Sequence, residues 1–297
     1  MTLSSPATCP VCGHSPRTSF RLSNGERLLR CPGCGLGWWN WGSFDPARFY
    51  DHDYFQSPTA SRGYSDYGAL EPGLRRTARD RLQRIGRWLA THGETAPTLR
   101  DLGCGTGVFL DEGRARFQVS GVEVSAYASQ LARARGLDVV QGAVEDDATT
   151  PGAYEVITLW DVIEHLRDPV GVVTMAARGL KPGGVLALST GDLGSWCARL
   201  SGASWHLFNL PEHLFFFTPR SLVLILERAG LIVRQTVREV NWVPLRYVVE
   251  RLTKTFSGRD RMLPLGFLGD RVVPATLGDV LGVYAVRPPV TTRIEIR

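Results

Sequence analysis

Four of the six cysteines form two copies of one short pattern, Cys9-Pro-Val-Cys12-Gly and Cys31-Pro-Gly-Cys34-Gly. Two residues between the thiolates let one tight turn present both sulfurs to a tetrahedral ion, and the following glycine relieves the turn. The spacing C-x2-C-x18-C-x2-C is that expected of a zinc ribbon. Two disulfides would need an oxidising compartment. We therefore expect Cys9, Cys12, Cys31 and Cys34 to bind a structural Zn²⁺ with no open position for catalysis.

A glycine-rich turn, Asp101-Leu102-Gly103-Cys104-Gly105-Thr106-Gly107, directly follows a predicted strand and opens a helix. Its third glycine comes one residue too early for the G-x-G-x-x-G pattern of dinucleotide sites, and Asp101 suits a ligand with an ammonium group better than a pyrophosphate. Glu123 ends the next predicted strand, where its carboxylate can accept hydrogen bonds from both hydroxyls of a ribose. Together the turn and this glutamate predict a nucleoside site.

Two histidines have the residue type and position of a general base. His165 follows the fourth predicted strand, in Glu164-His165, and His213 follows the fifth, in Glu212-His213. The pKa of histidine suits proton transfer near neutral pH, and an adjacent carboxylate can orient the ring. His213, Glu212 and His165 are therefore the candidate catalytic residues. Cys104 and Cys197 stand apart from the cysteine pairs and are expected to be packed side chains.

These residues must be positioned by strands and helices that alternate from about Thr98 onward, which predicts an α/β fold with a largely parallel sheet. The last two predicted strands should pair antiparallel at one edge. Ligands of such sheets bind beyond the carboxyl ends of the strands. The predicted strands are Thr98–Leu102, Phe117–Val124, Val139–Gln141, Tyr154–Trp160, Val185–Thr190, Leu231–Val237 and Leu281–Val286.

Three helices can be delimited by apolar periodicity and by their ends. Leu74–Leu89 is amphipathic, and its arginine cluster at 75–81 is expected to be a solvated face. Asp168-Pro169 caps a helix that runs to Leu180, before a turn at 181–184, and Thr218-Pro219 opens another that stops at Gly230.

The segments Asp101–Gly107, Gly121–Ser125, Tyr154–Pro169 and Leu180–Thr190 resemble the successive motifs of class I S-adenosylmethionine (SAM) dependent methyltransferases. The resemblance implies a Rossmann-like fold with a seven-stranded, mostly parallel sheet, preceded here by a zinc-ribbon module. Relatives often carry an aspartate where this chain has Ala143, so the adenine contact passes to the Val144 amide. The cofactor-binding residues that the resemblance implies are Asp101, Gly103, Cys104, Gly105, Gly107, Glu123, Val124, Val144, Trp160 and Asp161.

The two histidine neighbourhoods resemble different relatives. Glu212-His213 is similar to the Glu-His pair of deoxysugar C-methyltransferases, in which the histidine is the base; those enzymes also carry a four-cysteine zinc module and a further large C-terminal domain. Asp161-x-x-Glu164-His165 resembles the ubiquinone-biosynthesis O-methyltransferases, in which such residues help to bind a divalent ion. His165 thus has a structural or cofactor-bordering role as its alternative, and His213 has packing.

Aromatic side chains lie in the two stretches that would cover ligands. Those between 191 and 218 would form an apolar acceptor pocket or a packed core: Trp196, Trp205, His206, Phe208 and Phe215–Phe217. Three upstream tyrosines would close over the cofactor: Tyr54, Tyr64 and Tyr67. Trp160 would form a wall of the cofactor site or be a core aromatic.

The whole sequence indicates a zinc module at 1–55, a linker and helix at 56–97, and a methyltransferase domain at 98–297 with a substrate-covering insert at about 191–218. We expect methyl transfer from SAM to carbon or oxygen of a small molecule such as a sugar or polyketide. The chain is expected to be cytoplasmic, because the sequence shows neither a signal peptide nor an apolar run long enough for a membrane span.

Two alternatives remain open. The net charge of +5 and the pI near 9.0 are compatible with a zinc-ribbon RNA methyltransferase. Against it, the fourth strand ends in Trp160-Asp161-Val162-Ile163, without the Pro-Pro-aromatic signature of exocyclic-amine methylation, and the chain has no lysine-rich arm. The second alternative is a non-catalytic SAM-binding interaction protein. The sequence leaves the acceptor and the oligomeric state open.

Overall fold

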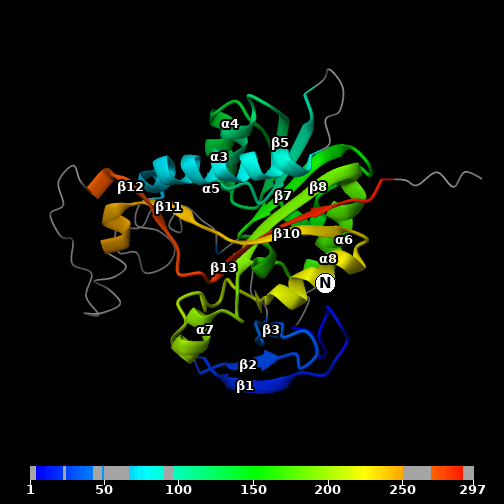
Figure 1. Ribbon diagram of the computed structural model, residues 1–297, viewed down its shortest axis with the longest axis vertical. Helices are drawn as coiled ribbons and strands as arrows, with labels where there is room; N and C mark the ends of the chain where they lie inside the picture. Colours follow the sequence, from blue (N-terminus) through cyan, green and yellow to red (C-terminus); the bar gives the residue numbers. More distant parts are fainter. Residues whose placement is uncertain are drawn as a thin grey trace, which may run out of the picture.

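The computed structural model describes residues 5–22, 25–42, 49, 67–89, 96–249 and 269–289. Its centre is a seven-stranded sheet in the order β10-β13-β8-β7-β4-β5-β6 (Figure 1). The strands are β4 (Thr98–Leu102), β5 (Gln118–Glu123), β6 (Asp138–Gln141), β7 (Tyr154–Trp160), β8 (Leu180–Gly191), β10 (Ile232–Arg238) and β13 (Val280–Val286).

The direction of the strands matches the expectation from sequence. β4, β5, β6, β7 and β8 are parallel to one another wherever they pair, whereas β13 is antiparallel to both β8 and β10. β7 is buried from Glu155 to Leu159, as near-continuous apolar strands of parallel sheets are. The predicted class I fold, a seven-stranded and mostly parallel sheet with helices, is confirmed.

Helices cover both faces of this sheet. On one face α3 (Glu71–Trp88), α4 (Val108–Gly113) and α5 (Ala126–Ala134) bury side chains against β4 and β7. On the other face α6 (Pro169–Gly179) and α8 (Pro219–Arg228) pack against the same strands. Because neighbouring residues of a strand point to opposite faces, Val156 belongs to the first core and Ile157 to the second.

The predicted helix starts are confirmed by their caps. The Asp168 carboxylate accepts a hydrogen bond of 2.8 Å from the Gly171 amide, and Thr218 forms a capping box with Ser221. The turn predicted at 181–184 is wrong: these residues belong to β8, because Leu180 pairs with Tyr154. The pairing register shifts in this region, and Gly183 has a φ of 81°, so the glycine-rich run produces an irregular strand instead of ending it.

The cysteine-containing segment is joined to the main domain by strand pairing. β1 (Arg17–Arg21), β2 (Arg27–Arg30) and β3 (Gly37–Trp38) form an antiparallel sheet whose fourth strand is β9 (Phe215–Phe216). One hydrophobic core therefore continues from the N-terminal sheet into the main domain. The domain limits at 55 and 97 stay a prediction, since each lies in or beside residues that the structure does not describe.

The remaining elements are short. The helix α7 (Trp196–Ser201) and the hairpin β11 (Asn241–Pro244) and β12 (Val272–Ala275) were not expected from sequence. Single 3-10 turns are η1 (Gly68–Leu70), η2 (Val144–Asp146), η3 (Ile163–His165) and η4 (Gly202–Ser204). Among the described residues, no helix combines the length and the apolar character that crossing a bilayer requires.

Candidate functional site

The three glycines after β4 all have positive φ, of 79°, 54° and 79° at Gly103, Gly105 and Gly107. A Cβ on Gly103 would lie 2.6 Å from the Val162 side chain, and one on Gly107 would lie 2.5 Å from that of Leu137, so packing excludes larger residues there. At Gly105 the nearest atom would be the Tyr67 hydroxyl at 4.0 Å. The middle of the turn therefore exposes its backbone to an approaching ligand, as a cofactor cradle requires.

Glu123, at the end of β5, is buried beside this turn. Its two carboxylate oxygens accept hydrogen bonds of 2.8 Å from the amides of Gly105 and Ser125, and burial raises its pKa. These amides fix the carboxylate at the carboxyl edge of the sheet. Because each oxygen has a second acceptor position, the side chain can also accept from the hydroxyls of a ribose.

Asp101, the last but one residue of β4, is 2% exposed. Its Oδ1 accepts a hydrogen bond of 2.6 Å from the Thr158 hydroxyl, and burial raises the pKa of its carboxyl to about 7. A ligand ammonium arriving here would favour the charged carboxylate. This residue therefore fits the role expected of it toward the cofactor.

The other cofactor candidates line the same edge of the sheet. Cys104 is buried against Gly121, where an added Cβ would lie 2.8 Å from the sulfur, and burial raises its thiol pKa, as expected for a packed cysteine. Val124 follows β5, and Val144 is buried in η2 directly beyond β6. Neither adds a charged group, so they offer backbone and apolar contacts.

Trp160 ends β7, Asp161 follows it, and the two residues share an arginine. The Arg81 guanidinium lies 4.2 Å from the centre of the Trp160 ring and 3.6 Å from Asp161 Oδ2. Its Nε lies 3.4 Å from Glu239 Oε2. Asp161 has a φ of 55°, an uncommon conformation for a residue other than glycine and one found at functional sites. Trp160 also packs against Phe109, so it is shared between the core and this edge.

The expectation of a solvated arginine face on α3 is wrong for Arg81, whose side chain is 9% exposed. The position of Arg81 in the sequence could have indicated its burial. It lies four residues from both Thr77 and Ile85, and residues at this spacing share one face of a helix, which here is buried. Its charge is matched by the buried Glu239, which no short-range pattern indicates.

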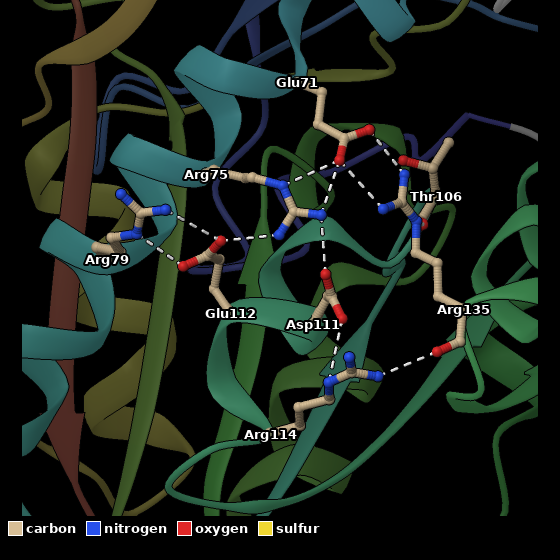
Figure 2. A network of polar contacts seen from close by, with 8 residues as sticks. All are labelled: Glu71, Arg75, Arg79, Thr106, Asp111, Glu112, Arg114 and Arg135. Atoms are coloured by element: carbon tan, nitrogen blue, oxygen red, sulfur yellow. Dashed lines mark hydrogen bonds and ion pairs between the residues drawn. The ribbon is translucent and has the colours of Figure 1, made fainter.

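Two other arginines of α3, Arg75 and Arg79, belong to a network that reaches the glycine turn (Figure 2). Arg75 and Arg79 both bind Glu112 of α4, and Arg75 also binds Glu71. Arg135, after α5, binds the same Glu71 and donates a hydrogen bond of 3.0 Å to the Thr106 carbonyl. The network therefore holds α3, α4 and the end of α5 around the turn.

The two candidate histidines lie against each other. Their ring centroids are 4.6 Å apart, with the planes at 88°. His165 Nδ1 lies 2.9 Å from the backbone carbonyl of Glu212, to which it donates as the neutral tautomer. Burial lowers the pKa of His165 to about 4 and that of His213 well below its ordinary value, so both rings are neutral at pH 7. The sequence suggested two separate sites, whereas in the structure the two histidines form a single site.

A buried glutamate completes this cluster. Glu164 is 4% exposed, its Oε2 has no hydrogen-bond partner among the described residues, and burial raises its pKa to about 8. Glu164, His165 and His213 bring one ligand atom each within 4.8 Å of the others. This set can move a proton or hold a divalent ion. Glu212 is buried too, and its backbone carbonyl accepts the hydrogen bond from His165 Nδ1.

The four N-terminal thiols gather at one point. Cys9 Sγ lies 3.5 Å from Cys34 Sγ, Cys12 Sγ lies 3.2 Å from Cys31 Sγ, and all four sulfurs lie within 4.8 Å of one another without a disulfide. The corners of a tetrahedron with Zn–S bonds of about 2.3 Å are about 3.8 Å apart. The donor set and its arrangement therefore fit Zn²⁺.

The aromatic residues expected over the ligands divide into two groups. Trp205 and Phe215–Phe217 are buried in the hydrophobic core, whereas Trp196 is 77% exposed. The core alternative is therefore correct for the first group. Tyr67 lies beside the glycine turn, and burial raises its pKa to about 12. Tyr54 and Tyr64 lie outside the described residues.

Comparisons with known proteins match this chain to methyltransferases. A family model described as a methyltransferase domain matches residues 72–236. A ubiquinone biosynthesis O-methyltransferase of Klebsiella pneumoniae is 31% identical over 171 residues, covering 53% of this chain and 67% of the relative. One of Serratia proteamaculans is 30% identical over 164 residues, covering 50% and 66%. The solved geranyl diphosphate C-methyltransferase of Streptomyces coelicolor is 19% identical, with a TM-score of 0.48 over 70% of this chain and 77% of that one.

The sheet order, the glycine turn with its acidic partner and the family match define a SAM-dependent methyltransferase. The chain belongs to the methyltransferase domain family. The matched segments span about two thirds of the length of these two curated relatives.

Proposed function

We propose that this enzyme methylates an oxygen or carbon of a small-molecule acceptor, and that His213 takes up the acceptor proton. The observation that carries the proposal is the neutral pair of the partly buried His165 and the buried His213. The pair lies beyond the carboxyl end of β7, the strand next to the glycine turn of β4. A neutral imidazole at this edge has a lone pair for a hydroxyl or an acidic C–H proton.

SAM, when bound, supplies a methyl group activated by its sulfonium, and the protein must align the acceptor in line with it. In this proposal Glu123 accepts from the ribose hydroxyls, Asp101 binds the ammonium group, and the Gly105 backbone borders the methionine portion. Val124, Val144, Trp160 and Asp161 border the rest of the cofactor site.

We assign the proton transfer to His213 and a positioning role to His165. His165 holds the Glu212 carbonyl through Nδ1, and Glu212 is the residue that precedes His213. Movement of the His165 ring would therefore displace the backbone that carries the base. Glu164 can help the two histidines to move a proton, or it can bind a divalent ion together with both rings. The turnover assay with Mg²⁺ or a chelator distinguishes these two roles.

The four-cysteine module is proposed to bind one structural Zn²⁺ through Cys9, Cys12, Cys31 and Cys34. With four thiolate ligands the ion has no position for the acceptor. Its contribution would be to fold a segment that joins the main domain through the pairing of β3 with β9.

The test is turnover with methyl-labelled SAM on phenols, nucleotide sugars and rRNA stripped of protein, with Mg²⁺ or a chelator. Phenols are included because of the curated O-methyltransferase relatives. We expect transfer to a small molecule, a loss of about 10²–10⁴-fold in kcat for His213→Ala, and an unchanged Kd for SAM. Glu123→Ala, the contrasting variant, should weaken SAM binding.

Four outcomes would contradict the proposal. Methylation of RNA alone would favour the nucleic-acid enzyme, and SAM binding without transfer to any acceptor would favour an interaction protein. Equal turnover by the wild type and His213→Ala would remove His213 as the base. Activity that disappears with the chelator and returns with Mg²⁺ would assign Glu164, His165 and His213 to an ion instead.

A further inference from the structure

A third group of metal-ligand side chains, separate from the four cysteines and from the histidine pair, comes from the segment of α7 and η4 and from the residue before β13. It consists of Cys197 in α7, His206 after η4, and Asp279 immediately before β13. One ligand atom of each residue lies within 4.8 Å of the others. We propose that these three side chains bind a divalent cation of the zinc type. The proposal is independent of the function proposed above.

Asp279 gives the group a buried negative charge. Its side chain is 3% exposed, and its Oδ2 accepts a hydrogen bond of 2.9 Å from the indole Nε1 of Trp205. The backbone is also fixed, because the Asp192 amide donates to the Asp279 carbonyl at 2.7 Å. Within the described part of the chain, no lysine or arginine forms an ion pair with Asp279. A buried carboxylate needs a cation or several hydrogen bonds to offset the loss of water.

The spacing of His206 and Asp279 suits shared coordination better than a direct hydrogen bond. His206 Nδ1 lies 3.6 Å from Asp279 Oδ2, beyond the range of about 2.7–3.2 Å for such bonds. A nitrogen and an oxygen bound to one tetrahedral Zn²⁺, each at about 2.1 Å, lie about 3.4 Å apart. The observed distance is close to this value.

The chemistry of the three donors selects the ion. A thiolate, an imidazole and a carboxylate together suit Zn²⁺, whereas Mg²⁺ and Ca²⁺ prefer oxygen ligands throughout. His206 has a side chain that is 39% exposed, so an ion can enter from solvent. Three protein ligands leave the fourth position for water, unlike the closed four-cysteine module.

An ion bound by this group would hold together two parts of the chain that are far apart in the sequence. Cys197 and His206 belong to the segment between β8 and β9, and Asp279 immediately precedes β13, an interior strand of the main sheet. The ion would connect the segment between β8 and β9 to the start of β13 and restrict the movement of that segment. The same segment carries His213 near its C-terminal end. It would therefore order part of the chain that lies over the carboxyl ends of the strands.

The first measurement is zinc per chain, by elemental analysis after dialysis against dilute Zn²⁺. The proteins are the wild type, Cys197→Ser, His206→Ala, and the control Leu200→Ser on the exposed face of α7. The wild type and control should bind about one equivalent more than either ligand variant. All four proteins keep the four-cysteine module, so its zinc cancels in the comparison.

The second measurement is the rate at which iodoacetamide alkylates Cys197, followed by mass spectrometry. Zinc should slow this reaction at least about tenfold in the wild type and in Leu200→Ser, because a coordinated thiolate is protected. In His206→Ala, which replaces an exposed side chain, zinc should have little effect. Equal zinc content in all four proteins, with alkylation that zinc leaves unchanged, would overturn the proposal and leave a plain His206–Asp279 ion pair.

Discussion

The indole Nε1 of Trp39 donates a hydrogen bond of 2.8 Å to the backbone carbonyl of His213. Trp39 directly follows β3, and His213 lies two residues before β9, so the bond extends the pairing of these two strands. The Thr218 hydroxyl also donates to the Cys34 carbonyl at 2.9 Å. The N-terminal segment therefore contacts the main domain on both sides of β9, at the His213 carbonyl and at the Thr218 hydroxyl, and it supports the residue proposed as the base.

Trp39→Phe should lower kcat while leaving SAM affinity unchanged. The substitution keeps an aromatic ring in the core but removes the donor to His213, which costs about 1 kcal/mol and frees the carbonyl to shift. The checks are steady-state kinetics and SAM titration. Trp196→Phe, at an exposed position, is the control. A Trp39→Phe enzyme with wild-type kcat would show that the module does not position His213.

Cys31→Ser should reduce bound zinc by about one equivalent and lower the melting temperature of the whole protein. The reason is that Cys31 belongs to the same continuous core as Phe215 and Leu214 of the main domain. Loss of the ion would leave three thiolates without their partner and expose that core. Differential scanning calorimetry with zinc analysis is the measurement, and Arg17→Ala, on exposed β1, is the control. An unchanged melting temperature would indicate a module that folds without metal.

Local patterns predicted the sheet and the glycine turn well. The apolar run of β7 and the caps at Asp168 and Thr218 are properties of neighbouring residues, so they can be recognised before any tertiary contact is known. The turn at 103–107 was found for the same reason, because its glycines follow a strand directly.

Long-range contacts could not be predicted in this way. His165 and His213 meet because η3 lies against β9, a strand of two residues that pairs with β3. A two-residue strand has no periodicity to detect. The pairing of Arg81 with Glu239 likewise joins positions far apart in the sequence, and it converts an apparent surface charge into a buried one.

SAM affinity should rise as the pH increases from about 5 to 7, and Asp101→Asn should lose this dependence. Burial raises the pKa of Asp101 to about 7, so the free enzyme holds a proton there at lower pH. Binding an ammonium group requires the ionised carboxylate, so the proton must be released. Calorimetric titrations in two buffers of different ionisation enthalpy measure that release. An affinity independent of pH in the wild type would contradict the assignment.

The raised pKa of Asp101 makes the stability of the ligand-free protein fall as the pH rises, which is opposite to the trend expected for SAM affinity. Because the folded pKa of Asp101 lies above its unfolded value of 3.8, the folded state binds the proton more tightly. Its contribution to stability is therefore complete below about pH 4 and is lost as the pH rises to about 7. Urea unfolding should show a smaller decline in Asp101→Asn than in the wild type, because the buried Glu123 and Glu164 contribute equally to both proteins. Glu227→Gln, on exposed α8, provides the matched loss of a carboxylate at the surface.

Arg135→Met should weaken SAM binding several-fold without abolishing folding. Arg135 is the one residue of the network in Figure 2 that contacts both Glu71 of α3 and the Thr106 carbonyl within the glycine turn. Without its Nε the turn loses a charge-assisted hydrogen bond, worth about 1.5–3 kcal/mol where well buried and less at this partly exposed site. The preorganisation of the Gly105 backbone for the ligand would decrease accordingly. Arg116→Met, at an exposed position, tests for a general effect of charge. If both variants bound SAM as the wild type does, the network would serve only to hold the helices together.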